Sequence, residues 1–241
     1  MMCLELFSGT GSIGRAFERL GWTVVSVDIC AKWKPTLVVD ILHWDYTVFP
    51  RDYFQFVWAS PVCTQYSVAK TVGVRDLDGA DRLVNKALEI ISYFGCNWAF
   101  ENPQTGLLKT RAIVEGLPYF DTTYCHYGRA YRKATRIWSS LVLSLHQPCT
   151  LRNPCSAMIE RRHPKTAQQS RRGNDPTDRN NTCTQRELYS IPDGLCDAIA
   201  GAANLAVEQS NVSNDQPDAR THVSSPAAFV SEELRSNPGD L

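Results

Sequence analysis

The sequence predicts an α/β protein in which a doubly wound, mostly parallel sheet carries a small, loop-rich basic insert. Three observations support this fold class. Short β-branched runs alternate with helical patterns through the first half of the chain, several of those runs end at polar residues, and aliphatic residues are scarce from His146 to Arg186. With 241 residues, of which 43% are hydrophobic and 21% charged, the chain suits one compact domain with an appendage and excludes two large domains.

A strand, a glycine-rich turn and a helix begin the predicted sheet. Residues 4–7 form a short apolar run, and residues 12–20 place Ile13 and Phe17 on one helical face. Gly21 follows at the point where a helix end favours a residue that tolerates positive φ. We therefore expect the first helix to end there.

The next predicted strands are three β-rich runs at residues 24–28, 37–40 and 54–59. A helical pattern covers residues 80–94, and residues 98–100 form another strand that runs into a Glu-Asn-Pro sequence. In open α/β sheets, ligands bind outside the carboxyl ends of the strands. The residues that follow these strands are therefore the first candidates for a functional site.

The rest of the chain divides into three predicted parts. Residues 141–187 form the basic insert, and residues 193–208 form a last helix that begins after a proline. We assign residues 1–140 and 188–208 to the sheet domain. From residue 209 to 241, Ser, Asn, Asp and Pro dominate, which predicts a disordered tail.

Charge and cysteine content narrow the class of protein. The 25 Lys and Arg residues balance 25 Asp and Glu residues, so a surface that binds a polyanion depends on local clustering of charge. No apolar stretch approaches the ~20 residues that span a bilayer, and the first residues lack the pattern of a secretory signal. We expect a soluble, non-secreted, intracellular protein, cytoplasmic or nuclear, without a membrane partner. Nine cysteines without a dense framework of pairs indicate reduced thiols.

The glycine-rich turn has a sequence typical of nucleotide binding. Residues 9–14 read Gly-Thr-Gly-Ser-Ile-Gly, the pattern that lets backbone approach a nucleotide cofactor. Asp28, at the end of the next predicted strand, can accept hydrogen bonds from two ribose hydroxyls of either NAD or S-adenosylmethionine. Asp40, one strand further on, can receive the adenine amino group. The alternative is that the glycine-rich turn serves only tight packing and that the two aspartates only cap neighbouring backbone groups, without binding a cofactor.

A cysteine and a glutamate follow two of the predicted strands. Cys63 lies in a loop just after a strand, where a thiol faces the ligand edge of the sheet. Its reactive form is the thiolate, and because a free cysteine has a pKa of about 8.5, Cys63 needs positive potential or a bound substrate to assist it. Glu101 can protonate or hydrogen-bond a polar ring atom of a substrate held over Cys63. Taken alone, Glu101 would more often cap a helix or form a salt bridge, but the pair favours catalysis.

With these residues in view, the chain resembles the DNA (cytosine-5)-methyltransferases, in particular their small phage-type members. The similarity covers residues 2–140 well and residues 188–208 loosely. Five motifs are similar in order and spacing: the cofactor loop at residues 7–11, the cofactor contacts Asp28 and Asp40, the nucleophile motif Pro61-Val62-Cys63, the acid motif Glu101-Asn102-Pro103, and the end of the Gln-x-Arg-x-Arg block at Thr135-Arg136-Ile137-Trp138.

The resemblance implies a Rossmann-like, S-adenosylmethionine-dependent methyltransferase fold, DNA as the partner and S-adenosylhomocysteine as a product. It also implies a covalent mechanism on a cytosine that has left the duplex stack. Cys63 would add to C6, Glu101 would protonate or hydrogen-bond N3, and Arg136 would hold O2. The residues implied to bind the cofactor are Phe7, Gly9, Thr10, Gly11, Asp28, Asp40 and Pro61.

Two positions depart from the family pattern. Val62 stands where the family has a proline before the nucleophile, which restores a backbone N–H and frees a dihedral angle. Ala134 takes the place of the first arginine of the Gln-x-Arg-x-Arg block, and Arg132 that of its glutamine. A catalytically silent DNA-binding or regulatory protein is therefore an alternative. An RNA cytosine methyltransferase is a weaker variant, and only the glycine turn suggests an NAD-dependent oxidoreductase.

The basic insert is expected to contact nucleic acid, because its arginines suit phosphate oxygens. The insert occupies the position of the family's target-recognition region, and its small size predicts a short recognition site or little sequence preference. A solvated, arginine-rich loop is the alternative. The candidate contacts are Arg132, Lys133, Arg161, Arg162, Arg171 and Arg172.

Four residues of the insert could hold zinc, namely Cys149, Cys155, His163 and Cys183. A metal would organise a segment that is too poor in apolar residues to fold alone. The spacing is irregular and lacks a C-x-x-C pair, so unrelated thiols in a loop are the alternative.

Overall fold

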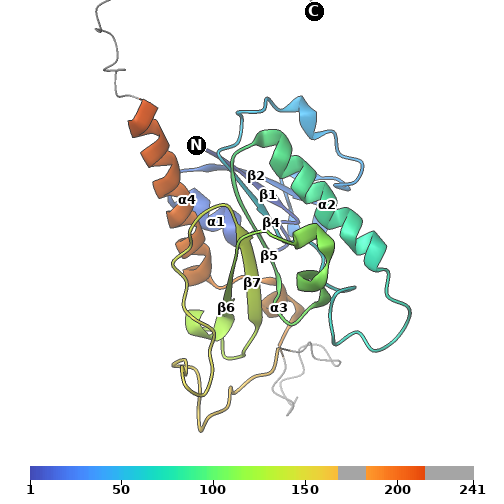
Figure 1. The fold of residues 1–241 in the computed structure, drawn as a ribbon, viewed down its shortest axis with the longest axis vertical. Coiled ribbons are helices and arrows are strands. Elements are labelled where there is room, and N and C mark those ends of the chain that lie inside the picture. The colour runs from blue at the N-terminus through green and yellow to red at the C-terminus, as the bar shows by residue number, and fades with distance from the viewer. Residues whose placement is uncertain (168–182, 215–241) are drawn as a thin grey trace, which may run out of the picture.

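A computed structural model describes residues 1–167 and 183–214 of the chain. The described residues form one seven-stranded sheet with helices on both faces (Figure 1). The strands are β1 (Met2–Leu6), β2 (Thr23–Asp28), β3 (Leu37–Val38), β4 (Phe56–Ala59), β5 (Asn97–Pro103), β6 (Tyr119–Thr123) and β7 (Ala134–Ser139). The α-helices are α1 (Ser12–Arg19), α2 (Leu77–Phe94), α3 (Gln185–Tyr189) and α4 (Asp193–Asn214). Short 3₁₀ helices are η1 (Ala31–Trp33), η2 (Tyr46–Val48), η3 (Leu107–Thr110), η4 (Ala112–Val114) and η5 (Tyr124–Tyr127).

The strand order, β3-β2-β1-β4-β5-β7-β6, places a topological switch at the centre of the sheet. The chain runs outward from β1 to β3 and then returns to β4, which pairs with the other side of β1. The pairs from β3 to β5 are parallel, whereas β7 lies antiparallel between β5 and β6. In such a sheet, ligands bind at the carboxyl ends of the strands beside the switch, which here are β1 and β4.

Apolar packing covers both faces of the sheet. Helices α1 and α4 lie on one face and α2 on the other (Figure 1). Along β4, Phe56 and Trp58 belong to the core under α1 and α4, while Val57 and Ala59 belong to the core under α2. Because successive side chains of a strand point to opposite faces, a strand covered on both sides must be apolar throughout. This explains the unbroken apolar run that marked β4 in the sequence.

The boundaries of α2 follow from its two end residues. The Asp76 carboxylate caps the helix by accepting a hydrogen bond from the Gly79 backbone N–H at 2.7 Å. At the other end, Gly95 takes the left-handed conformation with φ 60°, which is accessible to glycine at little cost. The helix therefore begins at Leu77, three residues before the start expected from its apolar pattern.

The predicted fold class, an α/β protein with a doubly wound and mostly parallel sheet, is confirmed. Strands β6 and β7 and helix α3 were not predicted. Helix α4 continues past residue 208 to Asn214, so the start of the predicted tail was placed too early, and residues 215–241 lie outside the described residues. Residues 141–167 contain no helix and no strand of the sheet, as expected for a loop-rich insert. No helix in the described part of the chain combines the length and apolar character that a membrane crossing needs.

Candidate active site

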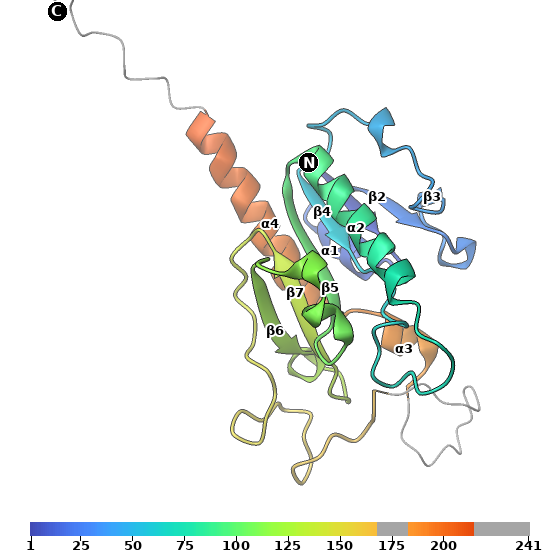
Figure 2. The same ribbon diagram turned by 45° about the vertical axis from the view of Figure 1, so that its right-hand side comes forward.

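A cavity of about 510 Å³ opens at the carboxyl ends of β1, β2, β4 and β5, beside the switch in strand order. Its volume lies within the range of roughly 300–1,000 Å³ that is typical of small-molecule sites. Helix α3, which lies below α2 in Figure 2, contributes Gln185, Leu188 and Tyr189 to the wall. The predicted site residues that line the cavity are Phe7, Gly9, Thr10, Asp28, Asp40, Pro61, Cys63, Glu101 and Lys133.

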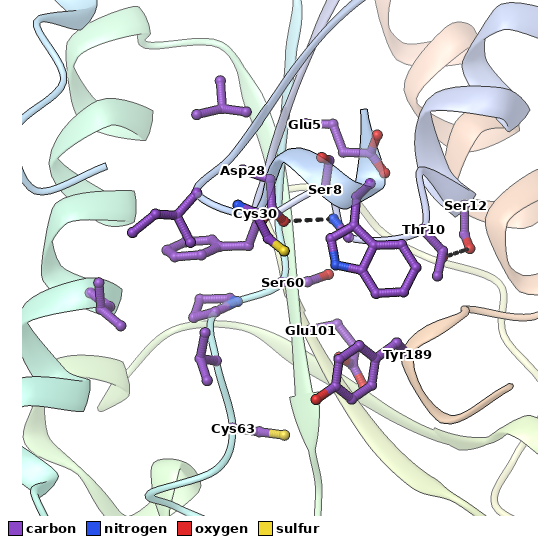
Figure 3. Close-up of a pocket in the computed structure, with 18 of the residues that line it drawn as sticks. Glu5, Ser8, Thr10, Ser12, Asp28, Cys30, Ser60, Cys63, Glu101 and Tyr189 are labelled. Atoms are coloured by element: carbon purple, nitrogen blue, oxygen red, sulfur yellow. Dashed lines mark hydrogen bonds between the residues drawn. The ribbon is translucent and has the colours of Figure 1, made fainter. Parts of the chain in front are cut away.

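The glycine-rich turn reverses the chain tightly between β1 and α1. Phe7, Gly9 and Gly11 have φ values of 54°, 48° and 67°, so three left-handed residues lie within five positions. Glycine adopts this conformation at low cost at positions 9 and 11, whereas the backbone of a residue with a side chain would be strained there. The Gly9 N–H donates a 2.8 Å hydrogen bond to Asp28, which joins the turn to the end of β2 (Figure 3). Gly11 shapes the turn but does not line the cavity.

The two aspartates lie at neighbouring strand ends and both face the cavity. Asp28 accepts hydrogen bonds on both oxygens, from the Gly9 N–H and from the Cys30 N–H, each at 2.8 Å. One Asp40 oxygen accepts the Leu42 N–H at 3.0 Å. A carboxylate oxygen has two lone-pair sites, so both residues keep acceptor capacity for a ligand.

Glu5 is an additional acidic residue of the cavity that the sequence analysis did not identify. Its carboxylate is buried under the glycine turn and accepts the Ile13 backbone N–H at 3.2 Å, at the start of α1. Burial raises the pKa of Glu5 to about 7, against the lowering effect of backbone hydrogen bonds from Gly14 and Ile13. A side chain at position 14 would place its Cβ 2.7 Å from this carboxylate, so the carboxylate would have to move to accommodate it.

Cys63 lies in the loop that follows β4, and a neighbouring strand fixes the start of that loop. The Asn102 side-chain amide on β5 donates a 2.9 Å hydrogen bond to the Pro61 carbonyl, two residues before the thiol. Burial raises the pKa of Cys63, the nearby Lys133 ammonium lowers it, and Glu101 raises it. The net shift is upward, so without substrate the thiol is favoured, and the Lys133 ammonium is the cation that favours the reactive thiolate.

Glu101 projects from β5 into the same cavity as Cys63 (Figure 3). It is buried, and one of its oxygens accepts hydrogen bonds from the Tyr124 hydroxyl at 3.2 Å and from the Thr135 hydroxyl. The Lys133 ammonium lies 3.8 Å from that oxygen and 4.5 Å from the centre of the Tyr124 ring. These contacts fix the carboxyl group on the wall of the cavity. The structure therefore brings the nucleophile candidate and the acid candidate together.

Arg136, in contrast, is not part of the cavity wall. On β7 it forms a paired salt bridge with Asp121, at 2.7 and 2.8 Å, and its guanidinium lies 3.5 Å from the centre of the Tyr119 ring. Alternation along the strand explains this placement, because Thr135 points toward Glu101 and its neighbour must point the other way. The cation beside the two reactive groups is Lys133, two residues before Thr135 on the same face. Arg136, the residue assigned to hold the base, therefore lies on the face of β7 opposite to Glu101.

Two further features of the site were not predicted. Arg75 donates hydrogen bonds to the backbone carbonyls of Gln65, Ser67 and Lys70 at 2.7–2.8 Å, and so holds the loop after Cys63 in a compact form. Trp33 and Tyr189 lie with ring centres 6.2 Å apart on the cavity wall. Neither feature belongs to a recognisable motif, since each depends on contacts between segments that are separated in sequence.

The described arginines that are expected to contact nucleic acid do not line the cavity. Arg132 is exposed and donates a 3.1 Å hydrogen bond to the Cys149 carbonyl, and Arg161 and Arg162 are exposed on a turn. Arg171 and Arg172 lie outside the described residues.

One member of the predicted zinc set was wrong. Cys183 is buried in the core under α4, where its thiol donates to the Thr166 carbonyl at 3.2 Å. The residue that gathers with Cys149, Cys155 and His163 is Cys125.

Comparison with known proteins adds an independent observation. A probable DNA (cytosine-5)-methyltransferase of Frog virus 3 (isolate Goorha) is 32% identical to this chain over 218 residues, which span 81% of this chain and 96% of the viral protein. This chain belongs to the DNA (cytosine-5)-methyltransferase family. The resemblance inferred from the five motifs is thereby confirmed. No protein-family model matches this methyltransferase.

Solved structures similar to the methyltransferase include EhMeth of Entamoeba histolytica, with a TM-score of 0.47 and 15% identity, and Dnmt2 of S. pombe, with a TM-score of 0.45 and 16% identity. A DNMT2 mutant of Spodoptera frugiperda gives a TM-score of 0.43 at 15% identity. Each match covers 61% of this methyltransferase, and the covered shares of those chains are 56%, 53% and 52%. The methyltransferase thus matches about half the length of these structures.

The cavity of the methyltransferase fits the methyl donor of its family, S-adenosylmethionine. Its walls combine apolar surface from Phe7, Trp33 and Pro61 with the acceptors of Asp28 and Asp40. A nucleoside needs this combination, because its ring requires apolar contact and its hydroxyls and amino group require acceptors. Because Gly9 has no side chain, the backbone of the glycine turn is open to close approach by the cofactor.

Proposed function

We propose that this methyltransferase transfers a methyl group from S-adenosylmethionine to carbon C5 of cytosine in DNA, through a covalent adduct on Cys63. One observation carries the proposal: Cys63 and Glu101 line the same cavity as the glycine turn and the two aspartates. Electrophile, nucleophile and acid would therefore meet at the ring of one base. The Frog virus 3 relative, a probable DNA (cytosine-5)-methyltransferase, supports the choice of substrate.

The reaction begins with addition of the Cys63 thiolate to C6 of the base. A carbon–sulfur bond forms, and the electrons of the C5–C6 double bond move toward C5 and N3 while Glu101 protonates or hydrogen-bonds N3. S-adenosylmethionine, when bound, would supply an electrophilic methyl group: its sulfur–methyl bond would break as C5 forms the new carbon–carbon bond, which leaves S-adenosylhomocysteine. Loss of the C5 proton to solvent then restores the C5–C6 double bond, the bond from C6 to Cys63 breaks, the thiolate is released, and any proton given to N3 returns to Glu101.

The side chains around Glu101 and Cys63 suit these steps. Tyr124 and Thr135 donate to one oxygen of Glu101, which fixes its orientation. Lys133 lies close to both reactive groups, and its charge favours the thiolate over the thiol. Asn102 fixes the loop that carries Cys63. Val62 is half exposed at the cavity, and because Cys63 still lines that cavity, the departure from the family pattern does not remove the nucleophile.

Trapping with 5-fluorocytosine tests the covalent step, because fluorine at C5 blocks the proton loss that releases the enzyme. With S-adenosylmethionine and a fluorinated duplex, the wild-type protein should form an adduct that survives denaturing electrophoresis. Cys63→Ser should form none, and Glu101→Gln should form it on the order of 10²–10⁴ times more slowly. Cys96→Ser, which removes a thiol outside the cavity, should behave as wild type.

Calorimetric titration with S-adenosylhomocysteine provides the folding control, since all four proteins should bind it and none should bind NAD. A wild-type protein that binds S-adenosylhomocysteine but forms no adduct on DNA or on RNA would overturn the proposal and favour a silent relative. An adduct on RNA alone would overturn the assignment of DNA as substrate.

A further inference from the structure

We propose that Cys125, Cys149, Cys155 and His163 bind one structural Zn²⁺ ion that attaches the basic insert to the catalytic sheet. Each residue offers one ligand atom, and these four atoms all lie within 4.8 Å of one another. The proposal concerns a second site, separate from the cavity that contains Cys63. It does not depend on the proposed reaction.

The distances between the ligand atoms suit a tetrahedral ion. The His163 Nε2 atom lies 3.3 Å from the Cys155 sulfur and 3.8 Å from the Cys149 sulfur. Zinc bonds of about 2.3 Å to sulfur and about 2.0–2.1 Å to nitrogen, arranged tetrahedrally, separate a sulfur from a nitrogen ligand by about 3.6 Å. The observed pairs lie on either side of this value, so small side-chain movements would close the site.

The four residues come from two parts of the fold. Cys125 belongs to η5, directly after β6, whereas the other three belong to the insert. Thr123, the last residue of β6, accepts hydrogen bonds from the Cys149 N–H at 2.9 Å and from the Cys125 thiol at 3.4 Å. One hydroxyl thus aligns a ligand from each part. An ion here would form a cross-link between the end of the sheet and the insert.

The burial of the thiols is difficult to explain by apolar packing alone. Cys125, Cys149 and Cys155 are buried in a small cluster apart from the two cores of the sheet, with only Ala157 and Met158 among the described apolar residues packed against them. Residues 141–167 have no helix and no sheet strand to stabilise them. Structural zinc supplies folding free energy where a segment lacks a core of its own.

The ligand set selects the metal and its role. Three thiols and one imidazole match the Cys₃His sites of structural zinc, whereas Mg²⁺ and Ca²⁺ prefer oxygen ligands. All four tetrahedral positions are filled by protein, which leaves none for a reacting water. The ion is therefore structural, not catalytic.

Fixing the insert has a consequence for nucleic-acid contact. Arg161 and Arg162 are exposed on a tight turn closed by two hydrogen bonds between Ile159 and Arg162, at 2.8 and 2.9 Å. This turn lies between Cys155 and His163, so an ion bound to both would hold its two ends together. The basic side chains would then be presented in a defined position instead of on a loose loop.

Metal analysis of the purified protein tests the site without any assay of methylation. The wild-type protein should contain about one equivalent of zinc, Cys155→Ser should lose it, and Cys183→Ser should keep it. Cys183 is the matched control, because it is also a buried cysteine near the insert but lies in the core under α4. Chelation of zinc from the wild-type protein should expose residues 141–167 to limited proteolysis while S-adenosylhomocysteine binding persists.

A cobalt-substituted wild-type protein keeps the proposal testable if Cys155→Ser does not fold. It should show thiolate-to-cobalt charge-transfer bands and the visible spectrum of tetrahedral cobalt. Less than about half an equivalent of zinc with no cobalt spectrum, a disulfide among the three cysteines, or equal zinc loss in Cys183→Ser would each overturn the site. Failure of the trapping experiment would leave these results unaffected, so the two proposals fail independently.

Discussion

At the scale of single residues, the chemistry of the site depends on a balance of charge around one sulfur atom. Burial raises the pKa of Cys63 and so favours the unreactive thiol, and the carboxylate of Glu101 adds to this effect. Lys133 opposes both. Because Lys133 also lies 3.8 Å from Glu101, one cation stabilises the thiolate and orients the acid. The identity of residue 133 therefore affects the pH at which the enzyme works.

Replacing Lys133 by Met should shift the pH dependence of methyl transfer. Without the ammonium the pKa of Cys63 rises further, so the thiolate forms at a higher pH. The rate at saturating DNA should fall more at neutral than at alkaline pH, and the midpoint of the rising limb should move to higher pH. Rates measured across this range test the prediction, with Lys109→Met, at an exposed lysine outside the cavity, as the control. An equal loss at every pH would contradict it.

The sequence could identify Cys63 and Glu101, because the carboxyl ends of parallel strands meet at one edge of a sheet. It identified Lys133 only as a candidate nucleic-acid contact and not as the cation beside Cys63 and Glu101. A shift of one residue along β7 exchanges the two faces of the strand, and the register with β5 is set by antiparallel pairing that local patterns do not reveal. Arg136 was assigned to the base from the resemblance to the Gln-x-Arg-x-Arg block, whereas its side chain pairs with Asp121 on the other face.

At the scale of elements, the loop from β4 to α2 is as important as the strands. It carries Cys63 and exposes apolar side chains at Val68, Val72 and Val74. Because no helix or strand forms within it, side-chain contacts must hold its shape. Asn102 fixes its first residues, and Arg75 joins three of its carbonyls near the other end.

Arg75→Ala should lower the rate of methyl transfer without weakening cofactor binding. The three carbonyls lose their common donor, so the loop samples other conformations and the thiol leaves its productive position part of the time. Misplacement of a reacting group by about 1 Å can cost up to about 100-fold in rate. Single-turnover rates should show the loss, whereas calorimetry with S-adenosylhomocysteine should show an unchanged affinity.

Arg82→Ala removes an exposed arginine from α2 and provides the matched control. A similar loss of rate in both variants would show that Arg75 contributes only charge and not the shape of the loop. No sequence motif predicts that Arg75 holds this loop, because an arginine bonded to backbone carbonyls cannot be distinguished in sequence from one on a solvated surface.

At the scale of the whole molecule, the beginning and the end of the described chain close on each other. Helix α4 packs on α1, the Trp22 indole N–H donates to Asn204 at 3.0 Å, and the Ile191 N–H donates to Ser12 at 3.3 Å. The apolar spacing of α4 predicted that one of its faces would be buried. The sequence could not predict that this face packs on α1. The hydrogen-bonded residues lie about 180 positions apart, and apolar spacing describes only the helix in which it occurs.

Glu5 lies where this closure meets the glycine turn, and it should make the stability of the whole fold depend on pH. Its pKa is about 7 in the folded protein and 4.5 when it is unperturbed, so between these values the folded state holds a proton that the unfolded state has lost. The stabilisation of the folded state by this bound proton is therefore fully present below pH 4.5 and is lost as the pH rises through 7. Because a tenfold change in a proton-binding constant corresponds to about 1.4 kcal/mol, the stability lost across this range is about 3 kcal/mol.

Glu5→Gln should remove this dependence, because a neutral amide can still accept the Ile13 N–H. Relative to wild type, the variant should gain free energy of unfolding steadily as the pH rises from 4.5 to 7. Urea denaturation at several pH values measures the difference, and Glu115→Gln, a change at an exposed glutamate that does not act on the pKa of Glu5, should show no such trend. A constant difference between Glu5→Gln and wild type would mean that Glu5 is ionised throughout, and the carboxylate would then be a permanent negative charge in the cofactor cavity.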